Sequence, residues 1–219
     1  MTSSSNTVNK IHTTLPGTVL FILLYVIATF LYPGGSPADP HSIGFSWQHN
    51  YWCNLLNADA LNGAPNTARP VAITALAVLS LTLALFWYRF PGYMRFGKTS
   101  RLIMRIAGIL SMCFALLIAG SWHDTAINIS GGFGIIAMAG TFSGLYTYRL
   151  GWLLIWGFFN LLLILTNTLV YNTEVFIDQL PVIQKISFLS FLGWICVIET
   201  LGLMQRSRKR SHSRRRKTR

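Results

Sequence analysis

Six apolar stretches of about twenty residues each dominate this chain of 219 residues. Inside a bilayer, backbone N–H and C=O groups find no water, so stretches of this length cross as helices whose hydrogen bonds close within the segment. Twenty residues rising about 1.5 Å each cover a hydrocarbon core of roughly 30 Å. The stretches are Leu15–Tyr32, Pro70–Phe90, Leu102–Ser121, Thr125–Tyr146, Leu150–Tyr171 and Ile186–Met204. The sequence therefore predicts an all-α membrane protein with six transmembrane helices.

Composition supports this class and divides the chain into three parts. Apolar residues make up 52% of the chain and charged residues only 11%, whereas soluble domains carry about 25% charged residues. Nine of the 18 basic residues lie in the last segment, 206–219, which contains no acid. We expect a disordered cytoplasmic segment at 1–14, the six-helix domain at 15–205, and a polybasic cytoplasmic tail at 206–219 that binds anionic lipid headgroups. Nucleic acid is not an expected partner, because no folded nucleic-acid module accompanies the charge.

The distribution of positive charge predicts the orientation of the six helices. With the N-terminus in the cytoplasm, 16 of the 18 basic residues fall in inner segments, and only Arg69 and Lys185 lie outside. Inner loops of membrane proteins are enriched in Lys and Arg. The sequence thus predicts that both termini are inside, in a cytoplasmic (inner) membrane of bacterial type, and that the long loop Pro33–Arg69 is outside.

The first apolar stretch has a second interpretation. Ser36-Pro37-Ala38 follows it and resembles the small-residue cleavage site of a secretory signal peptide. The proline in the middle of this triplet and the length of the stretch favour an uncleaved first helix.

Polar and reactive side chains concentrate on the outer side. The loop Pro33–Arg69 is too long for a simple connector, which makes it a candidate lid or site-forming segment. The sequence of residues 50–61 predicts a short amphipathic helix. This helix would place four apolar or aromatic side chains in the headgroup region, those of Tyr51, Trp52, Leu55 and Leu56. The candidate ligand-binding residues on this side are His49, Asn50, Cys53, Asn54, His123 and Asp124.

Two interpretations remain open for His123 and Asp124, between the third and fourth apolar stretches. Asp124 precedes the fourth stretch, so it is placed to cap that helix by accepting backbone N–H bonds. Alternatively, the carboxylate orients the imidazole of His123, which then acts as an acid, a base or a metal ligand. With His49, the pair would supply three ligands for zinc and leave one position open. No short ligand spacing such as His-x-x-x-His supports this site.

A few polar residues interrupt the apolar stretches themselves. Asn160, Asn167 and Glu199 are costly in a membrane and indicate either bonds between helices or a transport path. We expect the asparagines to bond across helices, and Glu199 to be satisfied by snorkelling or by pairing with Arg105. Small residues at four-residue spacing in Thr125–Tyr146 predict close helix packing, within one chain or between two copies.

Short motifs resemble those of a known group of proteins. Tyr32-Pro33-Gly34-Gly35-Ser36, then Asn50-Tyr51-Trp52-Cys53-Asn54-Leu55-Leu56, and later His123 are similar to an uncharacterised bacterial family of six-helix membrane proteins, itself distantly DRAM-like. The resemblance implies the fold and the membrane location and no established activity. Asn54 stands where Asp is commoner in that family. Alkaline-ceramidase and adiponectin-receptor-like hydrolases offer a second comparison, but the fifth and sixth stretches lack the histidines that hold zinc there.

These observations give one leading functional hypothesis and two alternatives. The protein is expected to bind or sense a lipid or small amphiphile at its outer face. The alternatives are a metal-assisted membrane hydrolase using His49, His123 and Asp124, and a small transporter using Asn160, Asn167 and Glu199. The sequence does not identify the ligand or the oligomeric state.

Overall fold

The computed structural model describes residues 13–94, 96–120 and 122–217, and beyond Gly202 it describes the backbone alone. The long helices are α1 (Thr14–Leu31), α2 (Arg69–Arg89), α3 (Lys98–Ala115), α4 (His123–Thr147), α5 (Gly151–Thr173) and α6 (Leu180–Lys217). Four short 3₁₀ turns accompany them: η1 (Trp52–Leu56), η2 (Phe90–Gly92), η3 (Leu116–Ala119) and η4 (Ile177–Gln179). Six helical segments are long and apolar enough to cross a membrane, which confirms the predicted all-helical class and is compatible with an integral membrane protein.

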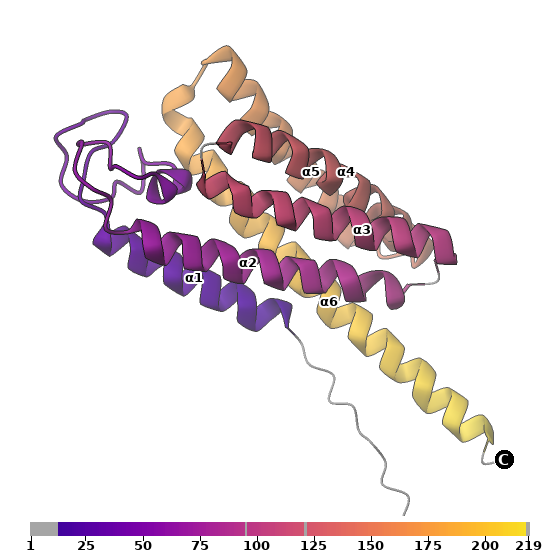
Figure 1. Ribbon diagram of the computed structural model, residues 1–219. Helices are drawn as coiled ribbons and strands as arrows, with labels where there is room; N and C mark the ends of the chain where they lie inside the picture. Colours follow the sequence, from indigo (N-terminus) through magenta and orange to yellow (C-terminus); the bar gives the residue numbers. More distant parts are fainter. Residues whose placement is uncertain (1–12, 95, 121, 218–219) are drawn as a thin grey trace, which may run out of the picture.

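The helices run side by side as an antiparallel bundle (Figure 1). Each of α1 to α4 packs against the next along the chain, α5 packs on α6, and α6 also contacts α1. The loop between α1 and α2, the α3–α4 hairpin and the α5–α6 connection gather at one end, here called the loop end. The α2–α3 link lies at the opposite end, the tail end, beyond which α6 continues.

Small residues bring α2, α3 and α4 close together. A Cβ added at Gly108 of α3 would collide with the Trp87 side chain of α2, and one added at Gly140 of α4 would collide with Met104 of α3. Close approach through small residues is the usual way in which helices pack in lipid. The small residues of α4 therefore form a packing face within one chain, as one of the two interpretations predicted.

Hydrogen bonds to α6 engage both of the predicted asparagines of α5, although Asn160 Nδ2 is buried without a hydrogen-bond partner among the described residues. Asn160 Oδ1 accepts a bond of 2.6 Å from Ser190 of α6, and Asn167 Nδ2 donates one of 2.7 Å to Ser187. Both amides are thus used between helices, which confirms the expectation that these asparagines bond across the bundle.

The prediction that Glu199 pairs with Arg105 is wrong. Glu199 is buried, and its carboxylate accepts a 3.0 Å bond from the backbone N–H of Thr14 and a 3.4 Å bond from the hydroxyl of Thr13. Arg105 instead donates to the carbonyl of Tyr88 at 2.8 Å. The first N–H groups of a helix have no partner within it, and the helix dipole favours a negative charge there, so the start of α1 competes successfully for the carboxylate.

The helix boundaries differ from the predicted ones at both ends of the chain. Thr14 is fully buried and begins α1, although it was assigned to the disordered segment 1–14; residues 1–12 lie outside the described part. The sixth helix begins at Leu180 instead of Ile186, because Pro181 is tolerated in a first helical turn and Lys185 finds partners there. The side chains of the polybasic tail also lie outside the described part, while its backbone is helical as far as Lys217.

The outward surfaces of the helices are apolar. Phe30, Ile135, Ile155 and Leu169 are each more than 60% exposed. A soluble protein rarely leaves a continuous apolar surface of this kind in water, so these faces suit contact with hydrocarbon.

Substitution of glycine by alanine should have opposite effects on stability at two positions, one packed against α2 and one open. Gly108→Ala should destabilise the bundle by about 1–3 kcal/mol, because overpacking forces the Trp87 side chain to move. Gly131→Ala in α4 meets nothing within 4 Å and should stabilise it by up to about 1 kcal/mol through helix propensity. Thermal unfolding in detergent measures both. Equal effects of the two variants would contradict the described α2–α3 packing.

Candidate functional site

The loop between α1 and α2 begins with a tight turn that requires glycine. Gly34 and Gly35 have φ values of +146° and +83°, a region that favours residues without a Cβ. The N–H of Gly35 donates to the carbonyl of Ser42 at 2.8 Å, and the hydroxyl of Tyr32 accepts a 3.0 Å bond from the N–H of Leu61. The Tyr-Pro-Gly-Gly motif therefore folds the loop back over the end of α1.

Asn50 and Asn54, two predicted binding residues, stabilise this loop. Asn50 is fully buried; its side chain accepts from the N–H of Ser46 at 2.8 Å and donates to the carbonyl of Gly35 at 2.9 Å. Asn54 is also buried, and its side-chain oxygen accepts from the N–H of Tyr51 at 2.7 Å, at the start of η1. The amide of Asn50 thus connects the loop to the glycine turn fifteen residues earlier, whereas Asn54 stabilises the start of η1 locally.

The expected amphipathic helix at 50–61 is wrong. Only the single turn η1 forms, and Trp52, Leu55 and Leu56 are buried in the protein instead of lying at the headgroups. The Trp52 ring lies 5.2 Å from that of Tyr25 in α1 and 5.6 Å from that of Phe188 in α6, between centroids. The apolar surfaces of α1 and α6 therefore cover the Trp52 ring within the protein.

Lys185 of α6 anchors the loop to the bundle. Its side chain is buried, and its ammonium donates to the carbonyl of Asn50 at 2.6 Å and to the carbonyl of Pro181 at 3.0 Å. Next to it, the side-chain oxygen of Gln184 accepts a 3.2 Å bond from the N–H of Trp52. A buried charge is costly unless it is hydrogen-bonded, so the ammonium holds the loop and α6 together.

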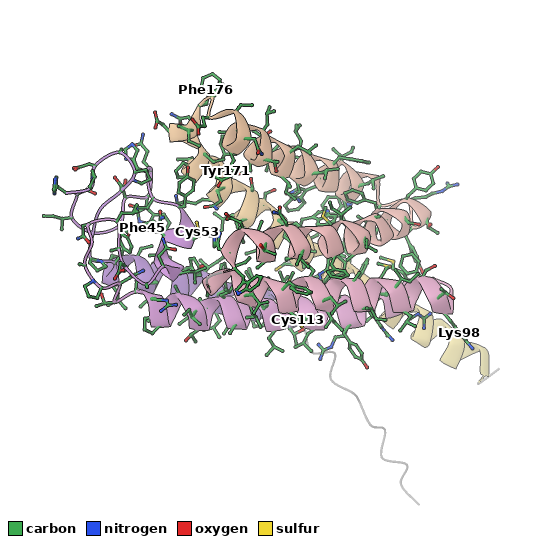
Figure 2. The ribbon with its side chains drawn as sticks, turned by 45° about the horizontal axis from the view of Figure 1, so that its top comes forward. Phe45, Cys53, Lys98, Cys113, Tyr171 and Phe176 are labelled. Atoms are coloured by element: carbon green, nitrogen blue, oxygen red, sulfur yellow. The ribbon has the colours of Figure 1, made fainter. Side chains whose placement is uncertain are left out.

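Cys53 lies beside this anchor. Burial raises the pKa of its thiol, although the Gln184 side chain, Lys185 and the backbone N–H groups of Cys53 and Asn54 act in the opposite direction. Because burial prevails, the sulfur is held as a neutral thiol, which is a poor nucleophile. Figure 2 places Cys53 in the loop region near the end of the bundle that carries Tyr171 and Phe176, and Lys98 at the far end.

His123 and Asp124 pair with each other. His123 Nδ1 lies 2.9 Å from Asp124 Oδ1, and the Asp124 side chain is 82% exposed. The capping interpretation is wrong, because α4 begins at His123 and Trp122 occupies the cap position without a side-chain bond. Asp124 therefore lies in the first turn, where its charge still suits the helix dipole.

The structure does not assemble the predicted metal site. His49 Nδ1 lies 3.2 Å from the hydroxyl of Ser46, within its own loop. Among the residues that the structure describes, no three His, Cys, Asp or Glu side chains form a group that could hold a metal ion. His49, His123 and Asp124 are all described, so together they offer no zinc centre.

His123 instead lines an open pocket of about 440 Å³ between the loop and three helix ends. Arg69 begins α2, residues 118–120 end the third apolar segment, and His123 begins α4. The Arg69 guanidinium donates from Nε to the carbonyl of Leu56 at 3.1 Å and from Nη2 to that of Ala119 at 3.4 Å. The lining residues are Leu56, Asn57, Ala58, Asp59, Arg69, Ile118, Ala119, Gly120 and His123.

The loop and the α3–α4 hairpin thus meet at a pocket that contains His123 but none of the other predicted site residues. His49, Asn50, Cys53 and Asn54 do not line the pocket, whereas Asp59 and Arg69, which were not predicted, do. One sequence signal pointed to Arg69: it and Lys185 are the two basic residues that break the positive-inside pattern. Both turned out to bind backbone carbonyls at the loop end.

Comparison of the chain with family models, with curated proteins and with solved structures gave no significant match.

Removal of the Lys185 charge should release the loop. In Lys185→Met the carbonyl of Asn50 loses its donor, and an unsatisfied buried carbonyl costs about 1–3 kcal/mol. We expect the backbone amides of Asn50 and Asn54 to exchange hydrogen at least about tenfold faster, as measured by hydrogen–deuterium exchange. Lys98→Met, an exposed lysine at the tail end, is the matched control and should leave these amides unchanged. Unchanged exchange in Lys185→Met would contradict the anchoring role.

Proposed function

We propose that this protein is an integral membrane protein that binds a lipid or small amphiphile at its outer face, in the pocket between the loop and the α3–α4 hairpin. Both termini are in the cytoplasm, and the loop end faces outward. The observation that carries the proposal is the pocket lined by Asp59, Arg69 and His123 where three helix ends meet.

The position of the pocket at the level of the lipid headgroups suits an amphiphile. Helix ends in a membrane protein lie near the headgroups, because the apolar helix spans the hydrocarbon. The pocket has the beginnings of α2 and α4 and the end of η3 in its wall. Leu116 and Leu117, which immediately precede its lining residues, are 43% and 51% exposed. A ligand with a polar head in the pocket can therefore lay its chain along apolar helix surface.

The chemistry of the pocket favours binding over catalysis. Its volume of about 440 Å³ falls within the range of roughly 300–1,000 Å³ usual for small-molecule sites. The described residues hold no metal-binding group, and the Cys53 thiol lies outside the pocket. The polar residues considered for transport are used within the bundle: Asn160 and Asn167 bond to α6, and Glu199 bonds to the start of α1.

The polybasic tail adds a second membrane contact. In this orientation residues 206–219 begin on the cytoplasmic side, where anionic lipids attract Lys and Arg by about 1 kcal/mol per residue near the surface. Residues 206–219 therefore keep the C-terminal part of α6 at the inner leaflet.

Occupation of the pocket can be tested by filling it. Ala58 is exposed and lines the pocket, so Ala58→Trp should block it without removing a hydrogen bond of the loop. We expect at least about a tenfold loss of affinity, or 1.4 kcal/mol, for an equimolar mixture of dioctanoyl phospholipids, measured by native mass spectrometry in detergent. Gln48→Trp adds the same bulk at an exposed loop position outside the pocket and should retain binding. Equal binding by the two variants would refute the site.

The orientation has its own test by cysteine labelling. In a variant lacking the native cysteines, Gln48→Cys should react with a membrane-impermeant maleimide in intact cells, because the loop is outside. Ser100→Cys, at the exposed start of α3 at the opposite end, should react only after the membrane is permeabilised. The reverse pattern would overturn the assigned orientation.

A further inference from the structure

Two opposite charges line the pocket without pairing with each other. Asp59 and Arg69 both line it, yet within the described part of the chain their side chains form no ion pair with each other. A carboxylate and a guanidinium that share a pocket and remain apart present a negative and a positive position to a ligand.

The positive position has a fixed direction. Two donors of the Arg69 guanidinium, Nε and Nη2, are held by the carbonyls of Leu56 and Ala119. These two bonds fix the plane of the guanidinium, so its remaining N–H groups are available in one orientation. A planar fork of this kind matches the oxygens of a phosphate group.

His123 adds a second group on the same side of the ligand. Its Nδ1 is occupied by Asp124, which leaves Nε2 as the ring nitrogen available to a ligand. In its protonated form an imidazole donates from both nitrogens, so that Nε2–H can donate to a phosphate oxygen. Arg69 and His123 together therefore suit a phosphate.

The negative position is Asp59. Its backbone pairs with Pro65 in an isolated bridge, which holds the residue at the pocket, and its carboxylate has no hydrogen-bond partner within the described part of the chain. A primary ammonium supplies up to three N–H donors to such a carboxylate. A quaternary ammonium has none and is usually held by an aromatic cage, but no Phe, Tyr or Trp among the described residues lines this pocket.

We propose that the pocket binds a zwitterionic aminophosphate headgroup of the phosphoethanolamine type, with its phosphate at Arg69 and His123 and its ammonium at Asp59. This inference rests on the proposed amphiphile site and names the ligand class of that site. An anionic headgroup such as phosphatidylglycerol would leave Asp59 unpaired beside its phosphate. A choline headgroup would offer Asp59 no N–H donor.

The test compares dioctanoyl phosphatidylethanolamine, phosphatidylglycerol and phosphatidylcholine on the full chain in detergent, by competitive native mass spectrometry. We expect the wild type to prefer the ethanolamine lipid about tenfold over the other two, a difference typical of one charged contact. Asp59→Asn should abolish this preference while total lipid binding persists. Asp178→Asn, an exposed carboxylate at the same end outside the pocket, should keep it.

The outcomes separate this inference from the proposed function. If Ala58→Trp abolishes binding but the wild type shows no preference, or Asp59→Asn leaves the preference unchanged, the aminophosphate assignment is wrong and the amphiphile site stands. If Ala58→Trp binds all three lipids as the wild type does, both fall.

Soluble O-phosphoethanolamine distinguishes a lipid from a free aminophosphate. It should displace the dioctanoyl lipid only at a concentration at least about a hundredfold higher, because it lacks the apolar chains that contribute to binding. Displacement at an equal concentration would show that a soluble aminophosphate is the ligand and would overturn the assignment to a lipid.

Discussion

Two cations bound to backbone carbonyls hold the loop end together. A long loop without regular structure contains carbonyl groups that no helix or sheet satisfies, and burying them without partners is costly. The ammonium of Lys185 donates a hydrogen bond to the carbonyl of Asn50, and the guanidinium of Arg69 donates to the carbonyls of Leu56 and Ala119. Asn50 and Leu56 belong to the loop and Ala119 ends η3, so the loop is attached both to α6 and to the helix ends around Arg69. The turn η1 lies between these two attachment points along the chain.

The tail end uses the opposite charge for the same purpose. At that end the first N–H groups of α1 have no partner within their own helix. The buried carboxylate of Glu199 accepts a hydrogen bond from one of them, the N–H of Thr14. A charged side chain inside a membrane helix need not mark a transport path when a helix terminus or a loop carbonyl lies within reach. In this bundle, charge near the span ends connects chain segments.

The same arrangement creates the candidate site. The Arg69 guanidinium donates to the carbonyls of Leu56 and Ala119 and forms no ion pair with Asp59 in the described part of the chain, so the pocket contains separate charges of both signs. The proposed site therefore results from the attachment of the loop: the contacts that stabilise the loop also fix the direction of the groups that we propose to bind the ligand. This preorganisation lowers the cost of binding.

The sequence by itself determined the helical class and the six helices long enough to cross a membrane, because hydrocarbon allows a backbone few other solutions. It also predicted that Asn160 and Asn167 bond across helices, since lipid offers them no partner. The tertiary structure decided which polar groups meet. His49 and His123 could be predicted to share a side of the membrane, but their separation depends on the path of the loop, which follows from the turn at Gly34 and Gly35 and from burial of Trp52 against α1 and α6. Those contacts join residues far apart in the chain, and no local pattern encodes them; for that reason the pocket contains Asp59 and Arg69, and His49 remains with Ser46 in its own loop.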